Sequence, residues 1–308
     1  MRTNTFLVSG TSALLIVGSI LVSCQKNSDL KSATTSTSGN TRVSNVTNVE
    51  NLLNRDDAEQ ATVSLALATS TTGGNIDALK NCAAIVSYDN PPGVYPRTVT
   101  VDWGTVNCYQ PKTGLTRRGK TLTTYYGDMS DTTSLSYYTQ TYDNYYVNDM
   151  LIEGETKVAH NSRNQDPQNI YRYTYNNKKV TQTNGDYIIM NGAKRLAKLV
   201  DDGEYPGPLA FTGNFKVTGI VNGDVLEGGV GYQYRDSIDQ DKGLTYQDCQ
   251  FPVKGLLYID FTNHSSWLID YSSGTAGTGT VVCDDQANIT VDGVTTPITL
   301  PFFRTDDY

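Results

Sequence analysis

Few residues in this chain have types and spacing that suit catalysis. His160 and His264 are the only histidines among 308 residues. No Gly-x-Ser-x-Gly elbow accompanies them, so a Ser–His–Asp triad has no sequence support. Glu153 and Glu155 flank Gly154, and this spacing places both carboxylates on one face of a strand. Glycoside hydrolysis needs two carboxylates that face each other across a cleft. We therefore predict no catalytic residues and favour a protein that is not an enzyme.

Metal binding has equally little support. The segment from Asp236 to Asp241 offers carboxylate oxygens on a turn, but it lacks the length and the distal Glu of an EF-hand loop. The cysteines show no Cys-x-x-Cys spacing, which structural zinc sites use. We expect neither a metal nor a cofactor.

Tyrosine is the dominant aromatic residue, with 21 copies against 7 of phenylalanine. Tyr171, Tyr173 and Tyr175 alternate with polar residues, which puts their three rings on one face of a strand. An exposed row of rings suits stacking on sugars or capture of a partner protein. Cross-strand packing of tyrosines inside a sheet gives the same pattern. The three residues are thus a candidate binding surface, with packing as the open alternative.

The N-terminus has the features of an export signal. Arg2 precedes an apolar run from Phe6 to Val22, which is diluted by small residues and short for a membrane span. The tetrad Leu-Val-Ser-Cys that ends at Cys24 resembles the bacterial lipobox. The resemblance implies that Cys24 carries a diacylglycerol and a further acyl chain such as palmitate. An ordinary cleaved signal and an uncleaved signal anchor are the alternatives.

Four segments follow from this organisation. Residues 1–23 are the expected lipoprotein signal peptide, and residues 24–48 form a lipidated tether rich in Ser, Thr and Asn. Such a composition buries too little apolar surface to repay the entropy of folding. Residues 49–70 are predicted to form an N-terminal helix, because their apolar positions are spaced at helical intervals. Residues 75–308 form a single β domain.

Period-two patterns dominate this last segment. Val99, Val101 and Trp103 share one face of a strand, and Trp267, Ile269 and Tyr271 repeat the pattern. Two-residue hairpin turns are predicted at residues 184–185, 222–223 and 292–293, where Asn-Gly or Asp-Gly occurs. We predict an all-β fold, an antiparallel meander forming a large curved sheet or sandwich, with one short N-terminal helix. One side of the sheet should face water.

Four cysteines remain once Cys24 is assigned to lipid, and an even number in an exported chain favours disulfides. Three pairings are available to four cysteines. An internal similarity favours Cys82–Cys108 and Cys249–Cys283, because each pair encloses a strand, a turn and a second strand.

The charge of the chain excludes one class of partner. Its formal net charge is −8, and no basic stripe follows a course that could track a phosphate backbone. We therefore expect no nucleic-acid partner.

Several longer runs resemble a recurring pattern in uncharacterised lipoproteins of Bacteroidota-type bacteria. These runs are residues 98–108 with 117–120, residues 142–148 with 152–154, and residues 283–293. The resemblance implies a lipid-anchored protein of the cell outer membrane, on its periplasmic or its surface face, and it carries no assigned activity. The expected function is a non-enzymatic binding or structural module for a glycan or an envelope protein. The alternatives are a carrier of a lipophilic ligand in a half-closed sheet and a glycan-active hydrolase.

Overall fold

The computed structural model describes residues 37–70, 82, 84–110, 114–129, 136–160, 170–198, 214–247, 251–262, 264–271 and 286–300. From Ser38 onward they belong to one compact unit. The predicted signal peptide and the cysteines Cys24, Cys249 and Cys283 lie outside the described residues. Within the ranges given, no helix is both long enough and apolar enough to cross a membrane.

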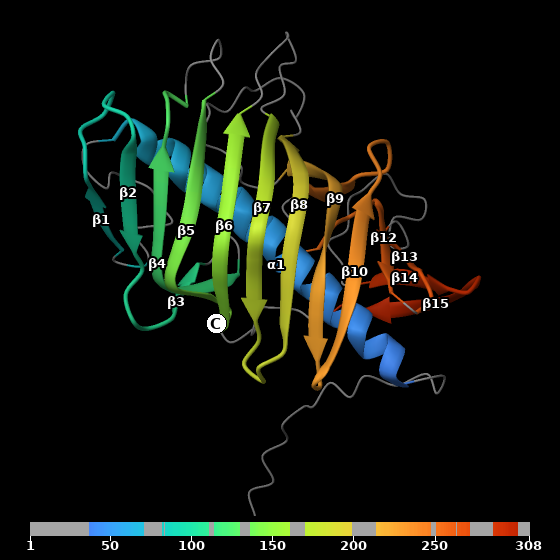
Figure 1. Cartoon of the computed structure of the whole chain (residues 1–308). Helices are drawn as coiled ribbons and strands as arrows, with labels where there is room; N and C mark the ends of the chain where they lie inside the picture. The colour runs from blue at the N-terminus through green and yellow to red at the C-terminus, as the bar shows by residue number, and fades with distance from the viewer. Residues whose placement is uncertain are drawn as a thin grey trace, which may run out of the picture. The chain divides into compact units, whose positions relative to one another are not determined.

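One antiparallel sheet contains all the described strands (Figure 1). The strands are β1 (Ile85–Tyr88), β2 (Arg97–Asp102), β3 (Cys108–Gln110), β4 (Leu115–Tyr125), β5 (Tyr137–Val147), β6 (Met150–His160), β7 (Ile170–Thr181), β8 (Tyr187–Lys198), β9 (Asn214–Glu227), β10 (Val230–Ile238), β11 (Leu244–Gln247), β12 (Leu256–Phe261), β13 (Trp267–Asp270), β14 (Gln286–Val291) and β15 (Val294–Thr299). Neighbours in sequence are neighbours in the sheet, except that β3 pairs only with β4 and β11 only with β9. The predicted antiparallel meander is confirmed.

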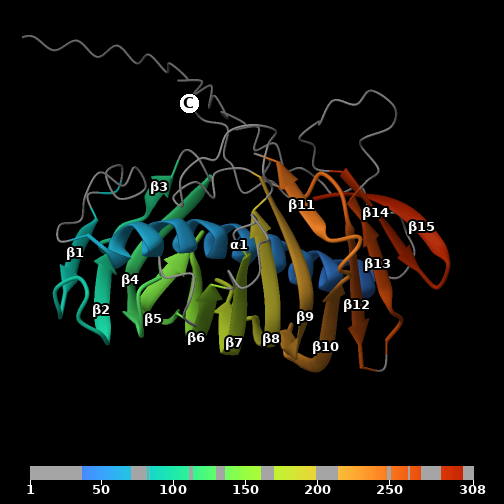
Figure 2. The ribbon, with the colours of Figure 1, turned by 90° about the horizontal axis from the view of Figure 1, so that it is seen from above.

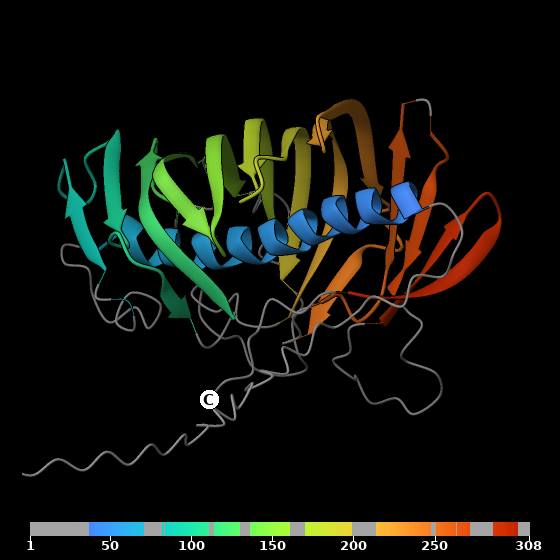
Figure 3. The ribbon, with the colours of Figure 1, turned by 90° about the horizontal axis from the view of Figure 1, so that it is seen from below.

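A single long helix, α1 (Thr37–Ala68), lies along one face of this sheet. Seen from above and from below, the strands curve around α1, and the helix lies on the inner side of the curve (Figures 2 and 3). The sheet stays open, because β1 and β15 end the strand order without pairing with each other. The face that contacts α1 is called the inner face below, and the opposite one the outer face.

Strand side chains alternate between these two faces, as the period-two pattern predicts. In β2 every second residue is buried, and Val99 and Val101 are 1% and 3% exposed. Trp267 and Ile269 of β13 repeat the pattern near the other end of the sheet. Burial of one face and exposure of the other is the expected arrangement for an antiparallel sheet with one wet side.

The predicted hairpin turns have different outcomes. Asp292-Gly293 joins β14 to β15, and Val291 pairs with Val294 across it, as predicted. Asn184-Gly185 lies in a longer connection between β7 and β8. Asn222-Gly223 is not a turn, so this prediction is wrong. A Cβ at Gly223 would stand 1.7 Å from the Ile189 carbonyl oxygen, so this glycine permits close approach of two backbones inside the sheet.

Helix α1 begins at Thr37, within the segment predicted as a tether, and ends at Ala68. The predicted start at residue 49 is therefore too late. Its polar side chains find partners in distant strands: the Tyr246 hydroxyl donates to Asn51 Oδ1 at 2.8 Å across 195 positions. Val46 and Thr47, which precede the predicted start, are buried as well, and such tertiary packing overrides the weak helix propensity of an Asn- and Thr-rich segment.

The C-terminus of α1 is capped by a buried arginine of β2. Arg97 Nη1 donates to the carbonyl oxygens of Leu67 and Ala68 at 3.0 and 2.5 Å, and its Nη2 donates to that of Ser70 at 2.5 Å. A cation is favoured there because the last carbonyls of a helix have no partner within the helix. The cap fixes this end of α1 against β2.

A disulfide joins Cys82 to Cys108, with a Cα–Cα distance of 5.3 Å. The first of the two predicted pairings is confirmed. The second, Cys249–Cys283, falls outside the described residues.

Candidate functional site

The three tyrosines of the predicted binding surface lie on the inner face of β7, beneath α1. Tyr171, Tyr173 and Tyr175 are 1%, 1% and 3% exposed. The hydroxyls of Tyr173 and Tyr175 donate to the carbonyl oxygen and to Oδ2 of Asp57, at 3.0 and 2.6 Å. Burial raises the pKa of all three phenols. These rings are therefore not an exposed surface, and the packing alternative holds.

Asp57 is the centre of a buried polar cluster between α1 and the sheet. Lys178 Nζ of β7 donates to Asp57 Oδ1 at 2.7 Å, and both side chains are almost completely buried. Burial raises the pKa of Asp57, although Lys178 opposes the rise. Burial also disfavours the charged form of Lys178, but the Asp57 carboxylate raises its pKa above the ordinary value. The pair is thus closed to solvent, and each side chain is bound to the other.

Two further cations repeat this arrangement along the inner face. Arg117 of β4 contacts Asp56 at 2.9 Å and Glu59 at 2.6 Å, with no exposed side-chain surface of its own. Lys194 of β8 contacts Glu50, and the Lys194 side chain is only 1% exposed. In each case the sheet supplies the cation and α1 supplies the acid.

The inner face is therefore filled by the molecule's own helix. Its carboxylates are bound to cations and phenols, which leaves them without access to a substrate. Among the described residues no group of three or more His, Cys, Asp or Glu side chains is placed to hold a metal ion.

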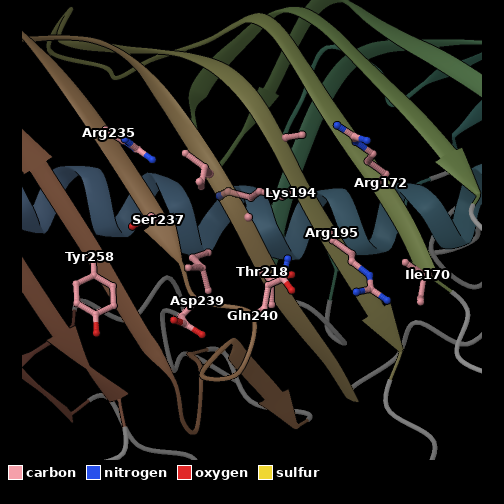
Figure 4. Close-up of a pocket in the computed structure, with 14 residues that line it drawn as sticks. Ile170, Arg172, Lys194, Arg195, Thr218, Arg235, Ser237, Asp239, Gln240 and Tyr258 are labelled. Atoms are coloured by element: carbon pink, nitrogen blue, oxygen red, sulfur yellow. The ribbon is translucent and has the colours of Figure 1, made fainter.

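The outer face carries a broad open pocket of about 970 Å³. It extends from β7 to β12, and Figure 4 looks onto it with α1 behind the strands. Its side chains combine cations, a carboxylate, small polar groups and two exposed apolar groups: Arg172, Arg195, Arg235, Asp239, Ser237, Ile220 and Tyr258. Ile220 and Tyr258 are 44% and 37% exposed.

Arg172 and Arg195 are direct cross-strand partners in β7 and β8. Like charges in this position repel each other and destabilise a sheet. The two side chains extend in different directions in Figure 4, and Arg235 lies on the opposite side of the pocket. No ion pair joins any of these three arginines to a carboxylate among the described residues, and all three are exposed. The pocket therefore holds three exposed cations that form no ion pair with a described carboxylate.

Two acids lie at the pocket: Asp239 lines it, and Asp260 is the cross-strand neighbour of Arg235. Asp239 Oδ1 accepts a hydrogen bond from the Asp241 backbone N–H at 2.7 Å, which closes a tight turn. The segment with carboxylates that resemble part of a calcium loop is thus a turn closed by its own hydrogen bond. Asp260 pairs with Arg235 in the strand register without forming an ion pair in the described structure.

The other residues singled out in the sequence are dispersed. Glu153 and Glu155 lie on β6 outside the pocket, and Glu153 pairs with Lys179 at 3.8 Å. His264 is exposed in the turn between β12 and β13, where its ring contacts Tyr232 edge-on at a centroid distance of 6.2 Å. The structure brings none of these residues together with another candidate.

Reasoning from the sequence missed the outer pocket. The signal for Arg172 was present, since it alternates with Tyr171 and Tyr173 and must take the opposite face. Arg195 and Arg235 gave no such signal, because their proximity depends on the pairing of β7 with β8 and on the place of β10 two strands away.

Comparison of the chain with protein-family models, with curated proteins and with solved structures found no match.

Proposed function

We propose that this chain is a lipid-anchored cell-envelope protein that acts as a non-enzymatic module binding an oligosaccharide in the outer-face pocket. The observation that carries the proposal is the pocket itself. Three arginines without an ion-pair partner in the described structure line this pocket together with exposed Ile220 and Tyr258. A concave site with an aromatic ring and a few placed polar groups is the usual form of a small-ligand site.

The anchor in this proposal rests on the sequence. The apolar run before Cys24 and the lipobox-like tetrad support lipidation at Cys24 and attachment to the outer membrane. Attachment by acyl chains leaves the domain free in the adjacent aqueous space. Acyl labelling of cells that express the chain should mark the wild type and leave Cys24→Ser unmarked. Labelling of Cys24→Ser would contradict the anchor without bearing on the pocket.

The two alternative functions have less support. A carrier for a lipophilic ligand needs an apolar concavity, but the concave face holds α1 and its buried ion pairs. A hydrolase needs two carboxylates across an open cleft, but the acids of α1 are paired and buried. The outer pocket is a hollow that the described residues leave open to a ligand.

Binding is tested with the full chain in detergent against a panel of neutral and acidic oligosaccharides. At least one class should bind, and Tyr258→Ala should weaken its binding by about tenfold, since a contacting aromatic ring contributes on the order of 1 kcal/mol or more. Tyr126→Ala is the matched control. Tyr126 is 47% exposed on the chain between β4 and β5, where it stacks on Tyr137, far from the pocket. Equal losses in the two variants, or no binding at all, would refute the pocket as a binding site.

A further inference from the structure

We infer that the ligand of the outer pocket is an acidic polysaccharide that carries uronic-acid carboxylates. This inference rests on the proposed function and specifies its ligand. The first ground is the Arg172–Arg195 pair, in which two cations stand opposite each other without a carboxylate between them in the described structure. A ligand carboxylate offsets this repulsion and can accept charge-assisted hydrogen bonds from either guanidinium group.

The position of Arg235 requires more than one anionic group. Arg195 and Arg235 are separated by two strand spacings and by four residues along the strands, as the β8–β9 and β9–β10 registers define. Strand spacing and rise place their Cα atoms about 16 Å apart. Arg235 lies across the pocket from the other two arginines (Figure 4). A single carboxylate can contact the arginines on only one side of the pocket. A ligand that contacts the arginines on both sides therefore carries more than one anionic group.

The surface between the arginines suits sugar rings. Thr218, Ile220 and Ser237 occupy neighbouring strands, and Ser237 pairs with Tyr258 in the register of β10 and β12. Hydroxyl groups there can exchange hydrogen bonds with sugar hydroxyls, while the Tyr258 ring and the Ile220 side chain can cover the apolar C–H face of a sugar. Small polar and apolar side chains therefore lie between the charged groups of the pocket.

Two other kinds of ligand, an extended peptide and an anionic membrane surface, fit the pocket less well. An extended peptide binds a sheet by adding a strand to its edge, but β7 to β10 are interior strands with both neighbours paired. An anionic membrane surface would favour a larger apolar patch, whereas Ile220 and Tyr258 are the exposed large apolar side chains of the pocket.

The net charge of −8 opposes a polyanion at long range. Exposed charges beyond about 8 Å are largely screened at physiological ionic strength, so the contacts within the pocket decide the affinity. Affinity should therefore fall as salt is raised, because each contact is an exposed ion pair.

The test measures binding of the full chain to galacturonate, glucuronate and mannuronate oligosaccharides and to their carboxyl-reduced forms. We expect carboxyl reduction to weaken binding at least about tenfold, as expected for the loss of a charge-assisted hydrogen bond. Arg195→Ala should produce a similar loss. Arg118→Ala is the control, because Arg118 is an outer-face arginine that already pairs with Asp149 and covers the Tyr146 ring. It should bind like the wild type.

Failure of this inference is distinguishable from failure of the proposed function. Equal binding of acidic and carboxyl-reduced forms, lost in Tyr258→Ala, would overturn the acidic ligand and leave the oligosaccharide site standing. Tighter binding of polyglutamate or of vesicles containing phosphatidylglycerol would also overturn it. Thermal unfolding checks the fold of each variant: Arg195→Ala should be at least as stable as the wild type, because it removes a like-charge contact.

Discussion

At the residue scale, the ion pair of Lys178 with Asp57 has a matched exposed counterpart at the next position. Lys178→Met leaves a buried carboxylate without its cation and should lower the free energy of unfolding by about 3–5 kcal/mol. Lys179→Met removes the exposed pair with Glu153 and should cost less than about 1 kcal/mol. Urea unfolding of the three proteins measures both effects.

The double variant Asp57→Asn/Lys178→Met separates charge from packing. The Asn amide oxygen can still accept from the Tyr175 hydroxyl, and the Tyr173 hydroxyl keeps its bond to the backbone carbonyl oxygen of residue 57, while no unpaired charge remains. It should recover part of the stability lost in Lys178→Met alone. A double variant less stable than the single one would contradict an electrostatic origin.

Asp236 predicts a pH dependence on the inner face of β10. Burial raises its pKa to about 6 from 3.8, although Lys194 Nζ at 4.0 Å lowers it. Between these pH values the unfolded chain has lost this proton and the folded chain retains it. The contribution of Asp236 to stability is therefore present below about pH 4 and falls as the pH rises to about 6, by on the order of 3 kcal/mol.

Asp236→Asn should lack this dependence, and its amide oxygen can still accept from the Val221 N–H that Asp236 Oδ1 bonds at 2.8 Å. Unfolding free energies of wild type and variant are compared at several values between pH 4 and pH 6. The variant should gain stability relative to the wild type as the pH rises. A constant difference would show that Asp236 does not keep its proton in the folded state.

At the scale of elements, the sheet contains shifts of strand register, which the sequence indicates only indirectly. The register of β6 and β7 shifts between Glu153 and Glu155, at Gly154. Gly154 has φ +93°, and a Cβ there would stand 2.2 Å from the Asn177 carbonyl oxygen. Gly154→Ala should therefore strain the backbone and also displace β7.

Gly185 is the control for this variant. It has φ +89°, but a Cβ there meets nothing within 4 Å. Gly185→Ala should cost about 1–2 kcal/mol, the usual penalty of a left-handed alanine, and Gly154→Ala should cost clearly more in the same urea experiment. Equal losses would mean that the β6–β7 irregularity adapts to a side chain.

The sequence predicted well which segments form strands, but it predicted poorly how the helix and the strands pack against each other. Alternation identified strands such as Arg97–Asp102, because burial of one face needs only local spacing. It did not predict which face α1 covers, so the row that includes Tyr173 was taken as a candidate surface while Arg172, one position away, is the exposed residue. The start of α1 was missed because it lies in an Asn- and Thr-rich segment, where tertiary packing buries residues such as Val46 and Thr47 in a way that local spacing does not reveal.

At the scale of the whole sheet, α1 connects strands that never pair with each other. Its C-terminus is held by Arg97 of β2, and its middle contacts Arg117 of β4 and Lys178 of β7. Nearer its start, Asn51 accepts from Tyr246 of β11. A helix that contributes to the core from Val46 to Ala68 should couple both ends of the sheet into one cooperative unit.

The two tryptophans of the chain allow this coupling to be measured. Trp103 follows β2 and is 2% exposed, whereas Trp267 begins β13 and is 7% exposed, so each reports burial at a different end of the sheet. Trp267→Phe leaves fluorescence from Trp103 alone, and Trp103→Phe leaves Trp267 alone. After correction for the stability of each variant by far-UV circular dichroism, fluorescence and dichroism should give one midpoint in each protein. A Trp267 midpoint well below the dichroism midpoint would mean that β12–β15 unfold separately, and that α1 stabilises the β2 end of the sheet without coupling it to the other.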